Sequence, residues 1–269
     1  MAITVCPVTP NFAAEIGDVD LSAPLAPSDL ADIKDAFATF AVLIFPDQHL
    51  SQDQHLDFAR YFGPLETTIA LHRKDAQLRV RKEFADVSNL GPDNEVWGKE
   101  SRQRMFQLGN RLWHTDSSFK RIPALASLLY ARSIPPIGGH TEFADERAAY
   151  DALSDAMKRR LDALVAEHSI FNSRAKLGFS NFSDEERQGL PPVPQVPGPH
   201  AAGVRPQIAL SRLPCRAHFR HVRAGRPRAD RRARCARHPA PVHLHASLAH
   251  PRSGDLGQSL HHASRHRLR

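Results

Sequence analysis

One short stretch of the chain combines residue types that can bind a metal ion. It runs from Leu112 to Phe119 and contains His114 and Asp116, two positions apart. In an extended segment alternate side chains project from one face, so this imidazole and carboxylate are predicted to lie side by side on a strand. Two histidines and one carboxylate form the facial triad that holds non-haem Fe(II) with open coordination positions. The stretch supplies two of these ligands; the alternative is a surface loop in which Asp116 caps a turn.

Apolar patterning predicts strands around this motif and helices before and after it. Continuous apolar runs of strand length indicate buried strands, and capping residues indicate where helices begin. The predicted strands are 3–6, 41–45, 123–131 and 140–145. The predicted helices begin at Ser28 and Ser51 and continue at 146–152 and 155–166. These patterns give a mixed, strand-rich class but no topology, and the irregular segment 66–110 is either a lid or a surface loop.

Other residues with chemical potential have simpler interpretations. His49, His55 and His72 lie near breaks between elements, where histidine is usually exposed, and are predicted to be surface residues. The three cysteines, Cys6, Cys215 and Cys235, have no metal-ligand spacing and fit a reducing cytoplasm. The start has no basic segment followed by an apolar run, and no apolar run has the length of a membrane span. We therefore expect a cytoplasmic protein without a membrane partner.

The positive charge of the chain is concentrated at one end. The whole chain carries a net charge of +7, but residues 201–269 contain 15 Arg, 2 Asp, no Lys and no Glu, a net charge of +13. The first 200 residues therefore carry 21 basic and 27 acidic residues, a net charge of −6. The same basic tail holds 9 of the 16 histidines. This break in composition separates a mildly acidic body from a basic tail.

From about residue 5 to 195 the body resembles the TauD/TfdA family of Fe(II)- and 2-oxoglutarate-dependent dioxygenases. The resemblance is strongest to the branch that acts on 2,4-dichlorophenoxyacetate and other aryloxyalkanoates. The segments that carry it keep the family's order and spacing. They are Asp18–Leu21, Val42–Phe45, Leu50–Gln54, Phe62–Glu66, Asp86–Asn89, Leu112–Phe119, Gly138–Phe143, Arg147–Leu153, Glu167–Ser169 and Asn172–Arg174.

The resemblance implies a fold, a site and a reaction. The fold is a double-stranded β-helix, or jelly roll, with flanking helices. His114 and Asp116 would be iron ligands, and Thr141 would help to hold the 2-oxoglutarate carboxylate; the alternative for Thr141 is a β-branched strand residue without such a role. We interpret His168 as structural. The reaction would use O2, with ascorbate as a reductant, to hydroxylate an aryloxyalkanoate such as 2,4-dichlorophenoxyacetate and to release succinate and CO2. The partner would be this small molecule rather than a specific nucleic acid, and the resemblance also suggests a homo-oligomer.

The family pattern fails in the tail. The family needs a distal histidine and, shortly after it, an arginine for 2-oxoglutarate, beside a W-D-N-R-x-x-M-H-R motif that residues 198–269 lack. Codons chosen for residues 255–265 and shifted by one base translate as I-W-D-N-R-C-T-M-H-R. The same shift gives family-like sequence, in the right order, for 206–217 and 229–248. We therefore infer a frameshift near 196–205, real or introduced in sequencing.

This inference divides the chain into two parts. Residues 1–197 would be a dioxygenase domain whose jelly roll lacks its closing strands, and 198–269 a poorly ordered, out-of-frame tail. The third iron ligand would be missing, since His261 and His262 fall near its place only by accident of frame. Activity would then be doubtful. Two alternatives stay open: an inactive relative whose tail binds nucleic acid or anionic surfaces nonspecifically, and a zinc-type cupin or hydrolase that uses His114 and Asp116.

Overall fold

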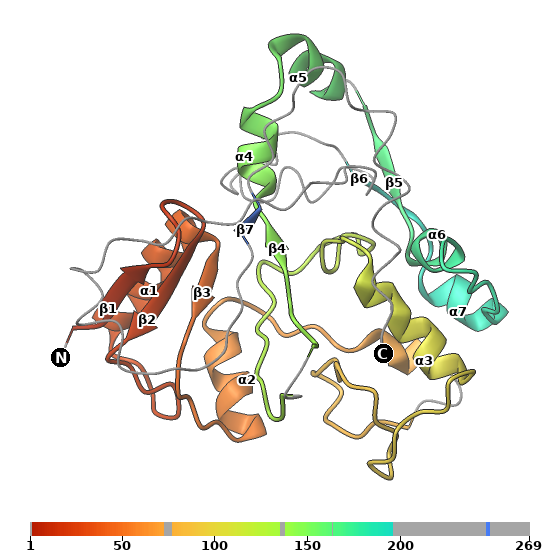
Figure 1. Cartoon of the computed structure of the whole chain (residues 1–269), viewed down its shortest axis with the longest axis horizontal. Helices are drawn as coiled ribbons and strands as arrows, with labels where there is room; N and C mark the ends of the chain where they lie inside the picture. The colour runs from red at the N-terminus through yellow and green to blue at the C-terminus, as the bar shows by residue number, and fades with distance from the viewer. Residues whose placement is uncertain (1, 73–76, 135–137, 163, 196–245, 248–269) are drawn as a thin grey trace.

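The computed structural model describes residues 2–72, 77–134, 138–162, 164–195 and 246–247 (Figure 1). These residues form a mixed structure of short helices and short strands. In chain order the elements are β1 (Thr4–Pro7), β2 (Ala13–Gly17), α1 (Pro27–Phe40), β3 (Val42–Ile44), α2 (Gln52–Arg60), η1 (Ile69–His72), α3 (Arg102–Gln107), η2 (Leu108–Arg111), β4 (Phe143–Ala144), α4 (Glu146–Asp151), α5 (Asp155–Asp162), β5 (Ala166–His168), α6 (Ile170–Ala175), α7 (Asp184–Gly189), β6 (Val193–Gln195) and β7 (Ala246–Ser247).

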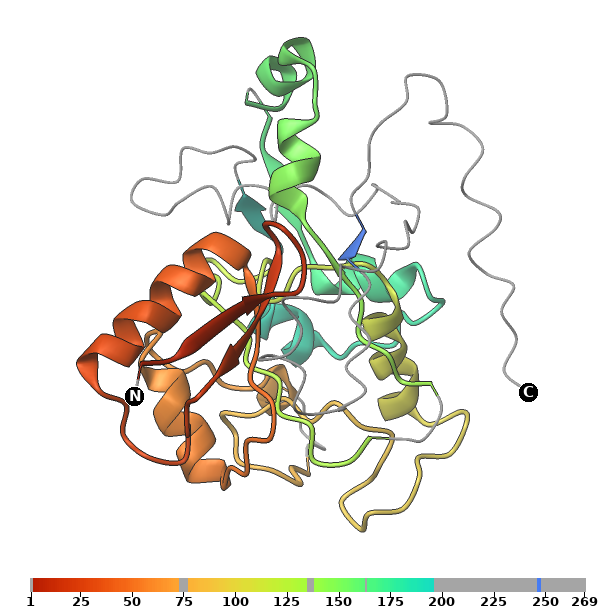
Figure 2. The same cartoon turned by 60° about the vertical axis from the view of Figure 1, so that its left-hand side comes forward.

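The N-terminal part is built on a three-stranded sheet. β2 lies in the middle, antiparallel to β1 and parallel to β3. α1 lies along this sheet (Figure 2). Ile16 of β2 and Ile33 of α1 are both almost completely buried in the same core cluster. Burial of these apolar side chains stabilises the sheet–helix pair, because it removes them from water.

α2, which follows β3 in the chain, also contributes to this core. Ser51 accepts a hydrogen bond from the backbone N–H of Gln54, whose side chain in turn accepts one from the N–H of Ser51. This reciprocal capping box fixes where the helix begins. Phe58 of α2 packs edge-to-face on Phe45, with ring centroids 5.5 Å apart, and joins the core cluster of Ile16 and Ile33.

A second, aromatic core holds α3, α6 and α7 together. Phe106 of α3 packs edge-to-face on Phe179 and Phe182, with centroids 6.1 and 6.4 Å apart, and Phe171 of α6 lies 4.5 Å from Phe182. Arg102 of α3 donates to both carboxylate oxygens of the buried Glu186, at 2.8 and 2.6 Å. α3 is therefore docked by aromatic packing and by an ion pair.

Two further strand pairs lie outside the first sheet. β5 is antiparallel to β6, and β4 is parallel to β7. Asp145 caps the N-terminus of α4 and holds the guanidinium of Arg147 at 3.0 Å. Arg147 also donates to the backbone carbonyls of Thr39 and Asn11, at 3.1 and 3.0 Å. These bonds attach the start of α4 to the N-terminal sheet and helix.

Several sequence predictions are confirmed by these elements. Strand 3–6 corresponds to β1, strand 41–45 to β3, and the helix that begins after Ser51 to α2. The segment 140–145 contains β4 and ends in the helix cap Asp145, as predicted. His168 is buried, in agreement with a structural role.

Other predictions were wrong in instructive ways. The run 123–131 forms no strand ladder with any described residue, and Leu125 and Leu129 in it are exposed, since an apolar run specifies neither a hydrogen-bonding neighbour nor burial on both faces. β3 is only partly buried. The first helix starts at Pro27 after Ala26 rather than at Ser28, because proline is favoured in the first turn. The predicted helix 155–166 ends at Asp162, and its last predicted residue belongs to β5.

The prediction that three histidines are exposed fails at His55. Its side chain is buried, with the ring 5.3 Å from Phe84 and 5.8 Å from Tyr130, whereas His49 and His72 are exposed. Burial, aided by the charge of Arg132, lowers the pKa of His55. Cys6 of β1 is disulfide-bonded, in contrast to the reduced thiols that the sequence suggests. The predicted tail from 198 onward, apart from 246–247, lies outside the described residues.

Candidate functional site

The two predicted metal ligands converge in the structure. Nε2 of His114 lies 3.3 Å from Oδ1 of Asp116, and both side chains are partly exposed, at 42% and 59%. Nδ1 of His114 lies 2.6 Å from the backbone carbonyl of Leu112. A carbonyl only accepts hydrogen bonds, so Nδ1 carries the proton and the lone pair of the neutral ring is on Nε2. The nitrogen that faces Asp116 is therefore the one available to a metal ion.

The backbone around this pair differs from the predicted strand. His114 lies in a segment without regular secondary structure, and a turn begins at Asp116 and continues to Phe119. Ser117 adopts a left-handed conformation, with φ of 59°, which is costly for a residue other than glycine. The side chains of His114 and Asp116 still lie together, so the prediction of a shared face is confirmed while the prediction of a rigid strand is wrong.

Contacts from distant segments hold this turn. The hydroxyl of Ser117 donates to Glu66 at 2.7 Å, and Lys120 pairs with the same carboxylate oxygen at 2.7 Å. The buried Gln195 of β6 donates to the backbone carbonyls of Ser118 and Lys120, at 3.1 and 3.0 Å. These bonds compensate the unfavourable conformation of Ser117 and fix the direction of the turn.

The carboxylate of Asp116 has a second partner. The hydroxyl of Ser127 donates to Oδ2 at 2.7 Å, whereas Oδ1 faces His114. The protonated ring of His114 donates from Nε2 to Asp116, and this hydrogen bond raises the pKa of His114, although burial opposes the shift. The hydrogen bond from His114 lowers the pKa of Asp116, and the bond from Ser127 adds to the effect. Near neutral pH Asp116 is consequently an anion that presents one oxygen beside the imidazole.

The segment that leads into His114 rests on α6. A Cβ atom on Gly109 of η2 would lie 2.0 Å from Cζ of Arg174, so the guanidinium lies directly against this glycine. Cζ of Arg174 also lies 4.7 Å from the ring centre of Phe106, and Nη1 donates to Ser173 at 3.0 Å. Only glycine leaves room for this contact. Arg174 therefore anchors α3 and η2, and through them the start of the site.

The structure does not assemble the rest of the predicted site. Thr141 is exposed, and within the described ranges it makes no hydrogen bond to His114 or Asp116. Among the described residues no group of three His, Cys, Asp or Glu could hold a metal ion. His261 and His262, which fall near the place of the distal histidine, lie outside these residues.

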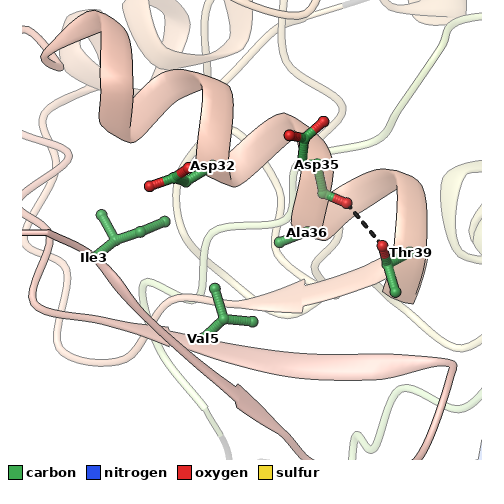
Figure 3. A pocket seen from close by; sticks show the side chains of 6 residues that line it. All are labelled: Ile3, Val5, Asp32, Asp35, Ala36 and Thr39. Carbon is green, nitrogen blue, oxygen red and sulfur yellow. Dashed lines mark hydrogen bonds between the residues drawn. The ribbon is translucent and has the colours of Figure 1, made fainter.

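A cavity elsewhere in the molecule is separate from this pair. It has a volume of about 280 Å³ and lies between β1 and α1 (Figure 3). Its lining residues are Ile3, Val5, Asp32, Asp35, Ala36 and Thr39. Neither predicted ligand contributes to it, so it adds nothing to the site.

The donor atoms present fit part of a metal centre. Imidazole nitrogen and carboxylate oxygen bind an ion such as Zn²⁺ at about 2.0–2.2 Å, so two donors 3.3 Å apart can reach the same ion. An imidazole and a carboxylate also match the ligand types of non-haem Fe(II) sites. His114 and Asp116 thus supply two adjacent ligands and leave the remaining positions to other groups.

Sequence reasoning missed the residues that support these ligands. Ser127 carries one weak signal, a small polar residue within an apolar run, and Glu66 lies in a segment that matches the family. Lys120 and Gln195 carry no local signal, because their partners are far away in the sequence. Their role becomes visible only from the hydrogen bonds of the folded chain.

Comparison with known proteins identifies the family. Residues 4–249 match the family described as "Taurine catabolism dioxygenase TauD, TfdA family". The chain is 41% identical over 194 residues to the alpha-ketoglutarate-dependent 2,4-dichlorophenoxyacetate dioxygenase of Cupriavidus pinatubonensis, covering 72% of this chain and 67% of the relative. The chain belongs to the TauD/TfdA family. It also matches the (S)-phenoxypropionate/alpha-ketoglutarate-dioxygenase of Sphingobium herbicidovorans, at 36% identity over 203 residues, 73% of this chain and 65% of that one.

A solved TauD/TfdA-type structure supports the same family. AAD-2 in complex with Mn(II) and N-oxalylglycine superposes with a TM-score of 0.71 at 42% sequence identity, covering 76% of this chain and 72% of AAD-2. The predicted family resemblance is therefore confirmed, together with the mixed helix–strand class; the strands of the described residues form a three-stranded sheet and two strand pairs, so the predicted jelly roll stays a prediction for this chain. Within the described residues no helix has the length and apolar character needed to span a membrane.

Proposed function

We propose that this chain is an Fe(II)- and 2-oxoglutarate-dependent dioxygenase whose substrate is an aryloxyalkanoate such as 2,4-dichlorophenoxyacetate. The observation that carries the proposal is the pairing of His114 Nε2 with Asp116 Oδ1, in a chain 41% identical to a 2,4-dichlorophenoxyacetate dioxygenase. Relatives that act on phenoxypropionate favour the same class of substrate. Mn(II) and N-oxalylglycine in AAD-2 are consistent with a metal and a 2-oxo acid in the same site.

Each residue of the site has a defined part in this proposal. His114 and Asp116 hold the metal through Nε2 and Oδ1, and Thr141 contributes to binding 2-oxoglutarate. Bound Fe(II) supplies the oxidative chemistry with O2. Glu66, Lys120 and Gln195 hold the turn, so the two ligands keep their relative position before the metal binds. This arrangement reduces the cost of ordering the site.

The reaction is tested by succinate formation. The present chain and a version with the family's C-terminal reading frame restored are each incubated with Fe(II), ascorbate, 2-oxoglutarate and 2,4-dichlorophenoxyacetate, and succinate and the phenol product are measured together; the variants below are made in the frame-restored version. His114→Ala is the matched variant, and Thr141→Val tests whether the KM for 2-oxoglutarate rises. Taurine in place of the aryloxyalkanoate tests the substrate class. Turnover that survives His114→Ala would contradict the assignment of the site.

We also propose that residues 198–269 are out of frame and that the jelly roll of this chain is consequently incomplete. The absence of the W-D-N-R-x-x-M-H-R motif and its distal histidine from the sequence of residues 198–269 supports this. Leu125 and Leu129 flank Ser127 and are 51% and 65% exposed, as expected for a face that further strands would cover. The match to the family model continues to residue 249, beyond the proposed end of the dioxygenase domain at residue 197. The position of the frameshift is therefore to be determined from the coding DNA.

The frameshift is tested by resequencing codons 190–210 and by the intact mass of the expressed protein. A missed base would restore a C-terminal W-D-N-R and M-H-R motif and a distal histidine. We expect a frame-restored version to turn over 2,4-dichlorophenoxyacetate and the present chain to show weak metal binding with little turnover. Equal activity of both versions would refute the proposal.

A further inference from the structure

We propose that Ser127 is a positioning residue for Asp116, an inference that rests on the proposed metal site. Its hydroxyl donates to Oδ2 at 2.7 Å, while Oδ1 lies 3.3 Å from Nε2 of His114. The two carboxylate oxygens therefore have different partners. Ser127 occupies one oxygen, and the other is presented beside the imidazole to the metal ion.

Ser127 is held in place by its own segment. In the run 123–131, Leu128 packs against the core cluster. The hydroxyl of Tyr130 donates to the carbonyl of Gln48 at 3.2 Å and accepts from the backbone N–H of Leu50 at 3.0 Å. Exposure alternates along this run, with Leu128 and Tyr130 partly buried and Ser127 and Leu129 exposed, so position 127 is directed away from the core. Ser127 is accordingly exposed and faces Asp116.

This geometry has a consequence for metal binding. A carboxylate can bind a metal through one oxygen or through both, and binding through both uses an additional coordination position. A hydrogen bond to Oδ2 favours binding through Oδ1 alone and restricts rotation of the carboxylate. Partners of this kind, one step removed from the metal, commonly change its affinity by about 10–100-fold. Ser127 thus acts through Asp116 and does not touch the metal itself.

The test measures binding of Mn(II) alone to the full chain by electron paramagnetic resonance, at metal concentrations up to the millimolar range. Ser127→Ala is expected to weaken binding by about tenfold or more. Ser127→Thr keeps the hydroxyl and, at an exposed position, should bind within about threefold of the unaltered chain. Ser51→Ala is the control, because it removes a helix-capping hydroxyl that is remote from Asp116.

The outcomes separate this inference from the proposed function. Binding by Ser127→Ala within twofold of the unaltered chain, together with loss of binding in His114→Ala, would overturn the role of Ser127 and leave the metal site standing. An equal loss in Ser127→Ala and Ser127→Thr would also overturn it, since the hydroxyl would then not be the cause. Unchanged binding in His114→Ala, or no binding by the unaltered chain, would overturn both.

Discussion

Replacing Glu186 of α7 with alanine should destabilise the packing of α3, the helix that precedes the segment carrying His114. Glu186 is 5% exposed and accepts two bonds from Arg102, at 2.8 and 2.6 Å, and one from the backbone N–H of Ser183, at 2.8 Å. Its loss would leave Arg102, whose side chain is only 27% exposed, without its carboxylate partner. Breaking a buried pair from one side costs about 3–5 kcal/mol, and the partial exposure of Arg102 places the expected loss near 2–3 kcal/mol.

Urea unfolding followed by far-UV circular dichroism measures this loss. With a slope of about 2–3 kcal/mol per molar urea, 2–3 kcal/mol corresponds to a midpoint about 1 M lower. Asp57→Ala is the matched control, because Asp57 pairs with Arg60 on an exposed helix surface, with side chains 68% and 53% exposed. Such a pair contributes about 0–0.5 kcal/mol.

A result in which both variants shift the midpoint equally would refute the reasoning. It would mean that the buried pair of Glu186 and Arg102 contributes no more to the free energy of unfolding than the exposed pair of Asp57 and Arg60. The double variant, Arg102→Ala with Glu186→Ala, provides a further check. It should be less destabilised than the sum of the single variants, because neither partner is then left buried and alone.

Three further results are expected from the contacts of the site. Gly109→Ala should destabilise by about 1–3 kcal/mol, since its Cβ would displace the guanidinium of Arg174; in an Arg174→Ala background, the same change should cost much less in thermal unfolding. Glu66→Gln should weaken Mn(II) binding more than Glu83→Gln, because Glu66 holds Ser117 and Lys120; equal affinities would contradict this. In the metal-free chain, the raised pKa of His114 means that its pairing with Asp116 adds stability below the ordinary pKa of histidine and loses it as pH rises through the raised value. Because the pKa of Asp116 is lowered, this contribution to stability is also lost as the pH falls through that lowered value. Asp116→Asn should therefore remove both the loss of stability at low pH and the loss above the raised pKa of His114, as measured by thermal unfolding across pH.

The sequence alone determined the local features of this protein. His114 and Asp116 are two positions apart, and a short extended segment is enough to bring their side chains together. The capping box at Ser51 and the cap at Asp145 are also local, because each joins residues two or three positions apart. The family was readable because its segments occur in order along the chain.

Only the tertiary structure decided what holds the site in place. Ser117 meets Glu66 across 51 positions, and Gln195 meets Ser118 across 77. No periodicity or spacing encodes such contacts, because they depend on how separate segments pack. For the same reason His55 was predicted to be exposed and is buried, and the run 123–131 was predicted to be a buried strand but pairs with no described strand. Local chemistry placed the two ligands beside each other, and long-range packing gave them Ser127, Glu66 and Gln195 as supports.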